Sequence, residues 1–98
     1  MRRKRAPRPP VEGGFAIDPG EPVYVIGVVS RLVKMPVWTL RLLEAEGLVR
    51  PKRTEGRTRL YSLQDVQRLM RIRHLYIEER VNCEGIRMIL RLEAATGS

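Results

Sequence analysis

The sequence predicts a small, mainly α-helical domain that carries a single β-hairpin. Three observations lead to this fold class. Apolar residues recur at helical spacing in four stretches after residue 22, proline and glycine separate these stretches, and a short β-prone segment in the middle turns at a glycine. A chain of 98 residues fits one domain, and 43% apolar residues suffice for a modest core.

The first two helices are expected to lie close together. An extended stretch over 23–26 leads into a first helix, which the spacing of the valines and leucines predicts over 27–34. Pro36 suits the first turn of a new helix, so a second helix is expected over 37–46, with Gly47 as its left-handed C-cap. Its expected inward face consists of Val37, Leu40 and either Leu42 or Leu43. Two short helices joined by a tight turn form a helix-turn-helix.

A basic hairpin is expected after the second helix. Two β-prone stretches, 48–53 and 58–61, flank a turn that contains Gly56. The only acid in this segment is Glu55, whereas its cations are Arg50, Lys52, Arg53, Arg57 and Arg59. Such an excess favours a wing that contacts phosphates over the alternative, a solvated loop. The predicted fold is therefore a winged helix-turn-helix.

Two further helices complete the expected domain. Ser62 and Asp65 have the spacing of a capping box, which predicts a helix over 63–79. Asn82 is expected to cap a last helix, and the buried stripe of that helix should be Ile86, Ile89 and Leu90.

The expected domain occupies residues 22–93, between a flexible basic arm at 1–21 and a frayed end at 94–98. The arm is rich in proline, glycine and cations, and the first cations are Arg2, Arg3, Lys4 and Arg5. Such an arm can follow a phosphate backbone or enter a minor groove. A solvated tail is the alternative.

The distribution of charge predicts a polyanionic partner. The formal net charge is +8. Segment 31–59 holds eight basic and three acidic residues, whereas segment 60–98 holds six and five. The positive charge is thus concentrated on the helix-turn-helix, the wing and the arm, as expected of a module with one DNA-facing side.

The sequence lacks the residues that several classes of function require. One cysteine, Cys83, and one histidine, His74, cannot form a four-ligand zinc site or a disulfide framework. We interpret Cys83 as a small buried apolar residue, with a redox sensor as the alternative. Neither paired carboxylates nor a nucleophile motif nor a phosphate loop occurs in a convincing setting, so we expect no enzyme, cofactor or metal. Without a membrane-length apolar run or a signal peptide, a cytoplasmic protein is expected, nucleoid-associated when bound to DNA.

A series of short motifs occurs in a fixed order between residues 23 and 93. The motifs are Thr39-Leu40-Arg41, Glu44, Gly47-Leu48-Val49, Pro51, Gly56, Arg59, Tyr61-Ser62 and Asp65-Val66. This order resembles the DNA-binding domain of MerR-family regulators. Further motifs resemble the HspR-type heat-shock repressors within that family, namely Tyr24-Val25-Ile26, Met35, Val81-Asn82 and Gly85-Ile86. The resemblance implies a sequence-specific repressor of heat-shock or chaperone genes, with the DnaK chaperone as co-repressor.

From these patterns we expect the helix that begins at Val37 to enter the major groove. The expected recognition residues are Trp38, Thr39 and Arg41. The expected backbone contacts from the wing are Lys52, Arg53, Arg57, Thr58, Arg59 and Tyr61. Two alternatives stay open: Arg41 pairs with Glu44 or Glu46 on its own helix, or Trp38 packs between neighbouring elements.

Several positions depart from the family pattern, among them Trp38, where a small or polar residue is usual. Lys34 stands where glycine is usual, Pro36 where serine or histidine is usual, and Leu42-Leu43 where an aromatic pair is usual. In the family those aromatic residues help to hold the phosphate backbone. We therefore expect that contact to be lost here or moved to the wing.

Assembly and rival functions also stay open. Family members bind inverted repeats as dimers through a long C-terminal helix, and this chain ends before such a helix could form. We expect a homodimer through the last helix, a dimer formed only on DNA, or a monomer. The first rival function is an architectural DNA-bending protein of the excisionase type. The second is an RNA-binding protein, which the scattered aromatic residues make less attractive.

Overall fold

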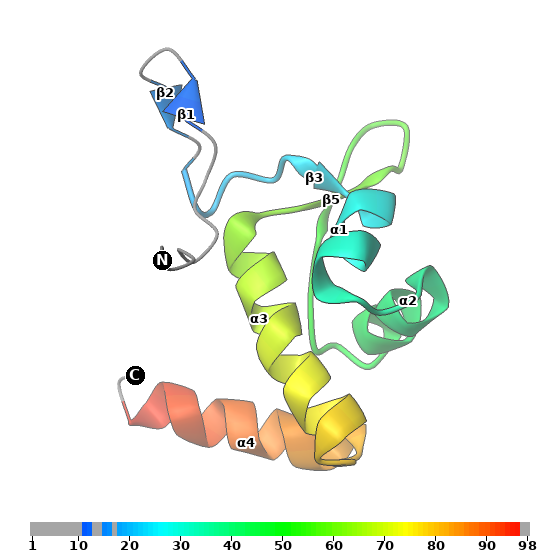
Figure 1. Cartoon of the computed structure of the whole chain (residues 1–98), viewed down its shortest axis with the longest axis vertical. Helices are drawn as coiled ribbons and strands as arrows, with labels where there is room; N and C mark the ends of the chain where they lie inside the picture. Colours follow the sequence, from blue (N-terminus) through cyan, green and yellow to red (C-terminus); the bar gives the residue numbers. More distant parts are fainter. Residues whose placement is uncertain (1–10, 13–14, 17, 97–98) are drawn as a thin grey trace, which may run out of the picture.

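The computed structural model describes residues 11–12, 15–16 and 18–96. The elements in chain order are β1 (Val11–Glu12), β2 (Phe15–Ala16), β3 (Tyr24–Val25), α1 (Ile26–Val33), α2 (Val37–Ala45), β4 (Lys52–Arg53), β5 (Arg59–Tyr61), α3 (Leu63–Arg73), the π-helical turn η1 (His74–Glu78) and α4 (Cys83–Ala95). Figure 1 shows α1 and α2 on one side of α3, while α4 leaves the lower end of α3 at a steep angle.

The two predicted helices of the helix-turn-helix are confirmed. α1 and α2 begin and end within one residue of the predicted ranges. Pro36 is the N-cap of α2, and Gly47 follows the helix with a φ of 76°. Two interactions stabilise the turn between the helices. The Ser30 hydroxyl donates to the Met35 carbonyl at 2.6 Å, and the Met35 side chain, 2% exposed, packs in the core.

The predicted hairpin is present, and it gains a third strand. β4 and β5 pair antiparallel, with Arg53 opposite Arg59. β3 pairs with the other edge of β5, where Tyr24 lies opposite Tyr61. Local sequence pattern cannot reveal this pairing, because the partners lie far apart in the chain. The turn contains Gly56 as expected, but the residue with a positive φ is Arg57, at 69°.

The last two predicted helices carry their predicted caps. The Ser62 hydroxyl accepts from the Asp65 backbone N–H at 3.0 Å, and the Asp65 carboxylate accepts from the Ser62 N–H at 2.9 Å. Asn82 accepts from the Gly85 N–H at 2.8 Å at the start of α4. The predicted helix over 63–79 changes from α to π geometry at His74.

At both ends, the described residues have more regular structure than the sequence predicted. α4 continues through Ala95, beyond residue 94, where fraying was expected to begin. β1 and β2 pair antiparallel within the stretch that was expected to be an irregular arm. The limits of the functional domain stay a prediction.

One hydrophobic core joins α1, α2, the sheet, α3 and the start of α4. Its buried members are Val29, Val33, Met35, Leu40, Leu43, Leu48, Val49, Tyr61, Val66, Leu69, Ile72, Leu75 and Ile86. On α4 only Ile86 of the predicted stripe is fully buried, whereas Ile89 and Leu90 are half-buried. No helix in the described part of the chain has both the length and the apolar character to cross a membrane.

Lys34 ends α1 in the left-handed conformation, with φ 57° and ψ 44°. A Cβ atom is strained in this region, whereas glycine occupies it freely. We expect Lys34→Gly to raise the free energy of unfolding by about 0.5–1 kcal/mol, after allowing for the larger entropy of glycine in the unfolded chain. Lys34→Ala keeps the Cβ and is the control, expected near the wild-type value. Urea unfolding measures all three proteins, and equal stabilities of the two variants would contradict the argument.

Candidate nucleic-acid interface

α2 has one face in the core and the opposite face in solvent. Leu40 and Leu43 are fully buried, as predicted for its inward side. Trp38 and Arg41, three residues apart and therefore on one side of the helix, are exposed. Trp38 is 67% exposed, so it does not pack between neighbouring elements. An aromatic ring and a guanidinium thus stand side by side on the outer face of α2.

Thr39 was expected to face DNA bases or nearby phosphates, and its burial corrects that expectation. It is 3% exposed. Residues four apart on a helix lie on the same side, so Thr39 shares its side with Leu43, which belongs to the core. Thr39 therefore contributes to the packing of α2 and is not part of its outer surface.

Arg41 is exposed and forms no ion pair within the described part of the chain. The alternative was a pairing with Glu44 or Glu46 on the same helix. Instead, Glu44 binds two arginines of the wing, and Glu46 binds Arg87 of α4. The guanidinium of Arg41 is thus available to a ligand outside the protein.

The loop between β4 and β5 is closed by its own hydrogen bonds. The Thr54 N–H donates to the Thr58 carbonyl at 3.0 Å, and the Arg57 N–H donates to the Thr54 carbonyl at 2.8 Å. The Thr58 N–H donates in turn to the Thr54 hydroxyl at 3.1 Å. Lys52 of β4 and Arg57 and Thr58 of the loop, which the sequence predicted as contacts to the DNA backbone, are exposed.

Two wing arginines are already engaged by an acid of α2. The Arg59 Nε lies 2.5 Å from Glu44 Oε1, and an Arg53 terminal nitrogen lies 3.2 Å from Glu44 Oε2. The Arg59 side chain is only 21% exposed. Arg53 and Arg59 were expected to bind phosphates. Their guanidiniums instead help to fasten the wing to α2, so they are less available to DNA than the sequence suggested.

Tyr61 was expected to contact the DNA backbone, and its burial corrects that expectation as well. Its exposed fraction is 0%, because it projects to the same face of β5 as Arg59, the face that packs on the helices. Its hydroxyl has no hydrogen-bond partner in the described structure. Burial, followed by the nearby Glu44 carboxylate, raises the pKa of Tyr61 to about 12.

Six exposed cations of this region form no ion pair within the described residues. They are Arg31, Lys34, Arg41, Arg50, Lys52 and Arg57. In Figure 1, α2 and the loop between β4 and β5 lie on the same side of the molecule, away from the end of α4. The predicted site residues did not include Arg31, Lys34 and Arg50, although the charge excess of segment 31–59 included all three and Arg50 was counted among the cations of the wing. Arg2, Arg3, Lys4 and Arg5 lie outside the described residues.

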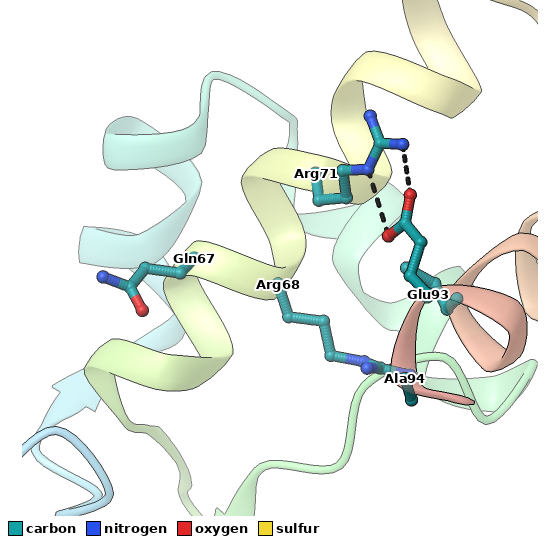
Figure 2. Close-up of a pocket in the computed structure, with 6 residues that line it drawn as sticks. Gln67, Arg68, Arg71, Glu93 and Ala94 are labelled. Atoms are coloured by element: carbon teal, nitrogen blue, oxygen red, sulfur yellow. Dashed lines mark hydrogen bonds and ion pairs between the residues drawn. The ribbon is translucent and has the colours of Figure 1, made fainter. Parts of the chain in front are cut away.

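A groove between α3 and α4 does not continue this cationic surface. It is lined by Gln67, Arg68, Arg71, Leu90, Glu93 and Ala94. Figure 2 shows Arg71 joined to Glu93 across the groove by two hydrogen bonds. These bonds lower the pKa of the Glu93 carboxyl below its ordinary value. The Arg68 Nε donates to the Leu48 carbonyl at 2.7 Å, so the arginines of the groove connect parts of the protein itself.

Neither Cys83 nor the potential metal-binding residues form a second candidate site in the described part of the chain. Cys83 is half-buried against the core, and burial raises the pKa of its thiol, which favours the unreactive protonated form. The described residues contain no group of three or more histidines, cysteines or carboxylates that could hold a metal ion. The cationic surface over α2 and the wing is thus the candidate site.

The chain matches one protein-family model over most of its length. The model for the MerR HTH family regulatory protein matches residues 24–93, from β3 through most of α4. The chain belongs to the MerR family. The family resemblance and the fold class predicted from the sequence are thereby confirmed.

Two known proteins are similar to this chain over most of its length. The chain is 43% identical over 79 residues to heat shock protein HspR of Streptomyces coelicolor, covering 81% of this chain and 52% of that protein. It is 36% identical over 69 residues to the HTH-type transcriptional regulator GlnR of Bacillus anthracis, covering 70% of this chain and 53% of that protein. The MerR-family chain thus spans about half the length of these relatives.

Two solved structures share the fold. The regulator PbrR691 of Ralstonia metallidurans, determined with lead(II), has a TM-score of 0.64 at 35% identity, over 72% of this chain and 56% of that one. HiNmlR, a MerR-family regulator that lacks the sensor domain and was determined on promoter DNA, has a TM-score of 0.62 over 74% and 57% of the two chains. Its identity is 20%, so it supports the fold alone.

Tyr61→Phe tests the burial of Tyr61. The substitution removes a buried hydroxyl without a partner, so stability near neutral pH should be unchanged or slightly higher, and DNA affinity should be unchanged. The raised pKa implies stability that is fully present below pH 10 and lost as the pH rises toward 12, because the unfolded chain ionises first. The variant should therefore lose less stability over that interval. Urea unfolding across this pH range measures it, and a drop in DNA affinity of the folded variant would contradict the burial.

Proposed function

We propose that this MerR-family protein is a sequence-specific regulator of transcription that represses heat-shock or chaperone genes. The observation that carries the DNA-binding role is the exposed pair Trp38 and Arg41 on α2, beside unpaired cations of the wing. The similarity to HspR of Streptomyces coelicolor supports the class of target gene. An excisionase-like architectural role gains nothing from the relatives described above, which are named as regulators or as a heat shock protein.

In this proposal α2 enters the major groove and the wing follows the flanking backbone. Arg41 donates to acceptor atoms on base edges, and Trp38 packs on an apolar group such as a thymine methyl. Lys52 and Arg57 bind phosphates, with Thr58 beside them. The arm cations Arg2, Arg3, Lys4 and Arg5 stay a prediction as further backbone contacts.

A homodimer on an inverted repeat would match the two-fold symmetry of such a site. Met88 and Leu92, four residues apart on α4, are 55% and 63% exposed and give that helix an apolar outer side. We propose this side as the contact between two copies. Sedimentation equilibrium with and without a promoter duplex tests the proposal, and a monomer in both conditions would contradict it.

The HspR-type resemblance extends the proposal to a chaperone partner of the DnaK kind. DnaK should then strengthen binding of the protein to its promoter, and a gel-shift titration with purified DnaK measures this. Since DNA is the proposed partner, we place the protein in the cytoplasm, associated with the nucleoid when bound. Fluorescence microscopy of a tagged full chain would contradict this placement if the signal lay at the membrane.

The experiment that tests the function is a binding titration over a salt series. Three probes are compared: a duplex from the gene's own promoter, a scrambled duplex and single-stranded RNA. We expect the promoter to bind about a thousandfold or more tightly than the scrambled duplex. Affinity for both duplexes should fall steeply with salt because phosphate contacts release counterions. Equal binding to both duplexes would favour the architectural alternative, and a preference for RNA would overturn the proposal.

Two substitutions separate base reading from phosphate binding in the same assay. Arg41→Ala should lower the preference for the promoter by about tenfold or more, because a base contact carries sequence information. Arg57→Glu should weaken binding to both duplexes alike and reduce the salt slope by about 1 or more. Arg80→Ala is the control, since Arg80 is exposed and lies outside α2, the wing and the proposed contact on α4. A changed sequence preference for the Arg57 variant would show that its assignment to phosphate is wrong.

A further inference from the structure

We propose that Glu44 is a positioning residue that fixes the wing to α2, so that both meet DNA as one rigid unit. The proposal rests on the proposed DNA-binding function and adds to it a residue that touches no DNA. Glu44 is placed for this task, because it stands on α2 between Leu43, which is buried, and the exposed end of the helix. Its two carboxylate oxygens reach the two strands of the wing separately.

The register of the hairpin explains why the wing needs an anion here. Arg53 and Arg59 are directly opposite each other on β4 and β5. Like charges at such a pair repel and destabilise the pairing of the strands. Glu44 Oε1 accepts from Arg59 at 2.5 Å and Oε2 accepts from Arg53 at 3.2 Å. One carboxylate therefore converts a repulsive cross-strand pair into a clamp between the wing and α2.

The clamp extends from the helix to the tip of the wing. Arg53 uses its other terminal nitrogen to donate to the Arg57 carbonyl at 3.2 Å. Arg57 is the residue whose φ of 69° forms the turn. The side chains of Glu44 and Arg59 are each 21% exposed, so this pair is better shielded from water and salt than an ordinary surface pair. The position of the Arg57 side chain is thus linked to α2 through Arg53 and Glu44.

A charge role and a positioning role predict different effects when Glu44 is neutralised. If Glu44 were only a negative charge near DNA, its loss would release two arginines and tighten binding to every duplex. If Glu44 positions the wing, its loss lets the wing move relative to α2. The base contacts and the backbone contacts then no longer fit one DNA site together, and the preference for the promoter falls. A charge role therefore leaves the promoter preference unchanged, whereas a positioning role lowers it, and this difference separates the two roles.

The test compares two variants, Glu44→Gln and Glu55→Gln. Each variant loses one negative charge from the candidate interface. Glu55 is exposed in the wing and has no partner within the described residues, which makes it a matched control. For Glu55→Gln we expect an equal, modest tightening on promoter and scrambled duplexes. For Glu44→Gln we expect the promoter preference to fall about tenfold or more, while circular dichroism shows the variant folded at the assay temperature.

A readout on the free protein makes the result specific to the wing. Amide hydrogen exchange of Arg57 and Thr58, whose N–H groups close the loop, should become faster in Glu44→Gln and stay unchanged in Glu55→Gln. A folded Glu44→Gln variant that keeps the wild-type promoter preference overturns the positioning role alone. A wild-type protein without promoter preference overturns the proposed function, and the positioning role with it.

Discussion

A helix of nine residues is not stable in water by itself, because its few hydrogen bonds do not repay the entropy of forming the first turn. α2 therefore depends on the packing of Leu40 and Leu43, both 0% exposed, against the core formed by α1, α3 and the sheet. The same packing decides which side of the helix faces outward. With Leu40 and Leu43 in the core, Trp38 and Arg41 lie on the opposite side, and the candidate interface follows from the core.

This dependence explains which features could be predicted from the sequence. Helix limits, the capping box at Ser62 and the cap at Asn82 follow from local spacing, and the structure has them. Thr39 lies next in sequence to Trp38, but the helix turns it to the side of Leu43. The burial of Thr39 can be predicted only when it is known that Leu43, and not Leu42, faces the core. Helical spacing alone allowed either Leu42 or Leu43 on that face and did not decide between them.

In the wing, the number of cations does not predict which of them are free to bind DNA. Its cations can be counted in the sequence, but whether each is free depends on contacts across the fold. Glu44 is nine residues from Arg53 and fifteen from Arg59, spacings without any local signature. Tyr61 is buried because it lies on the face of β5 that packs on the helices, and a local sequence pattern does not show which face that is. Arg41, Lys52 and Arg57, in contrast, have exposed side chains without an ion pair in the described part of the chain, and their contacts with DNA stay a prediction.

The anchoring of α2 at its other end connects the interface to the remainder of the molecule. The carbonyl of Glu46, just past the helix, accepts from Arg87 of α4 at 2.7 Å, and the carbonyl of Leu48 accepts from Arg68 of α3 at the same distance. Cations at a helix C-terminus satisfy carbonyl groups that the helix leaves open and interact favourably with its dipole. Residues just after α2 therefore bind α3 and α4, and Glu44 of α2 binds the wing. The backbone that follows the proposed recognition helix is thus held by side chains of α3 and α4 as well as by the core.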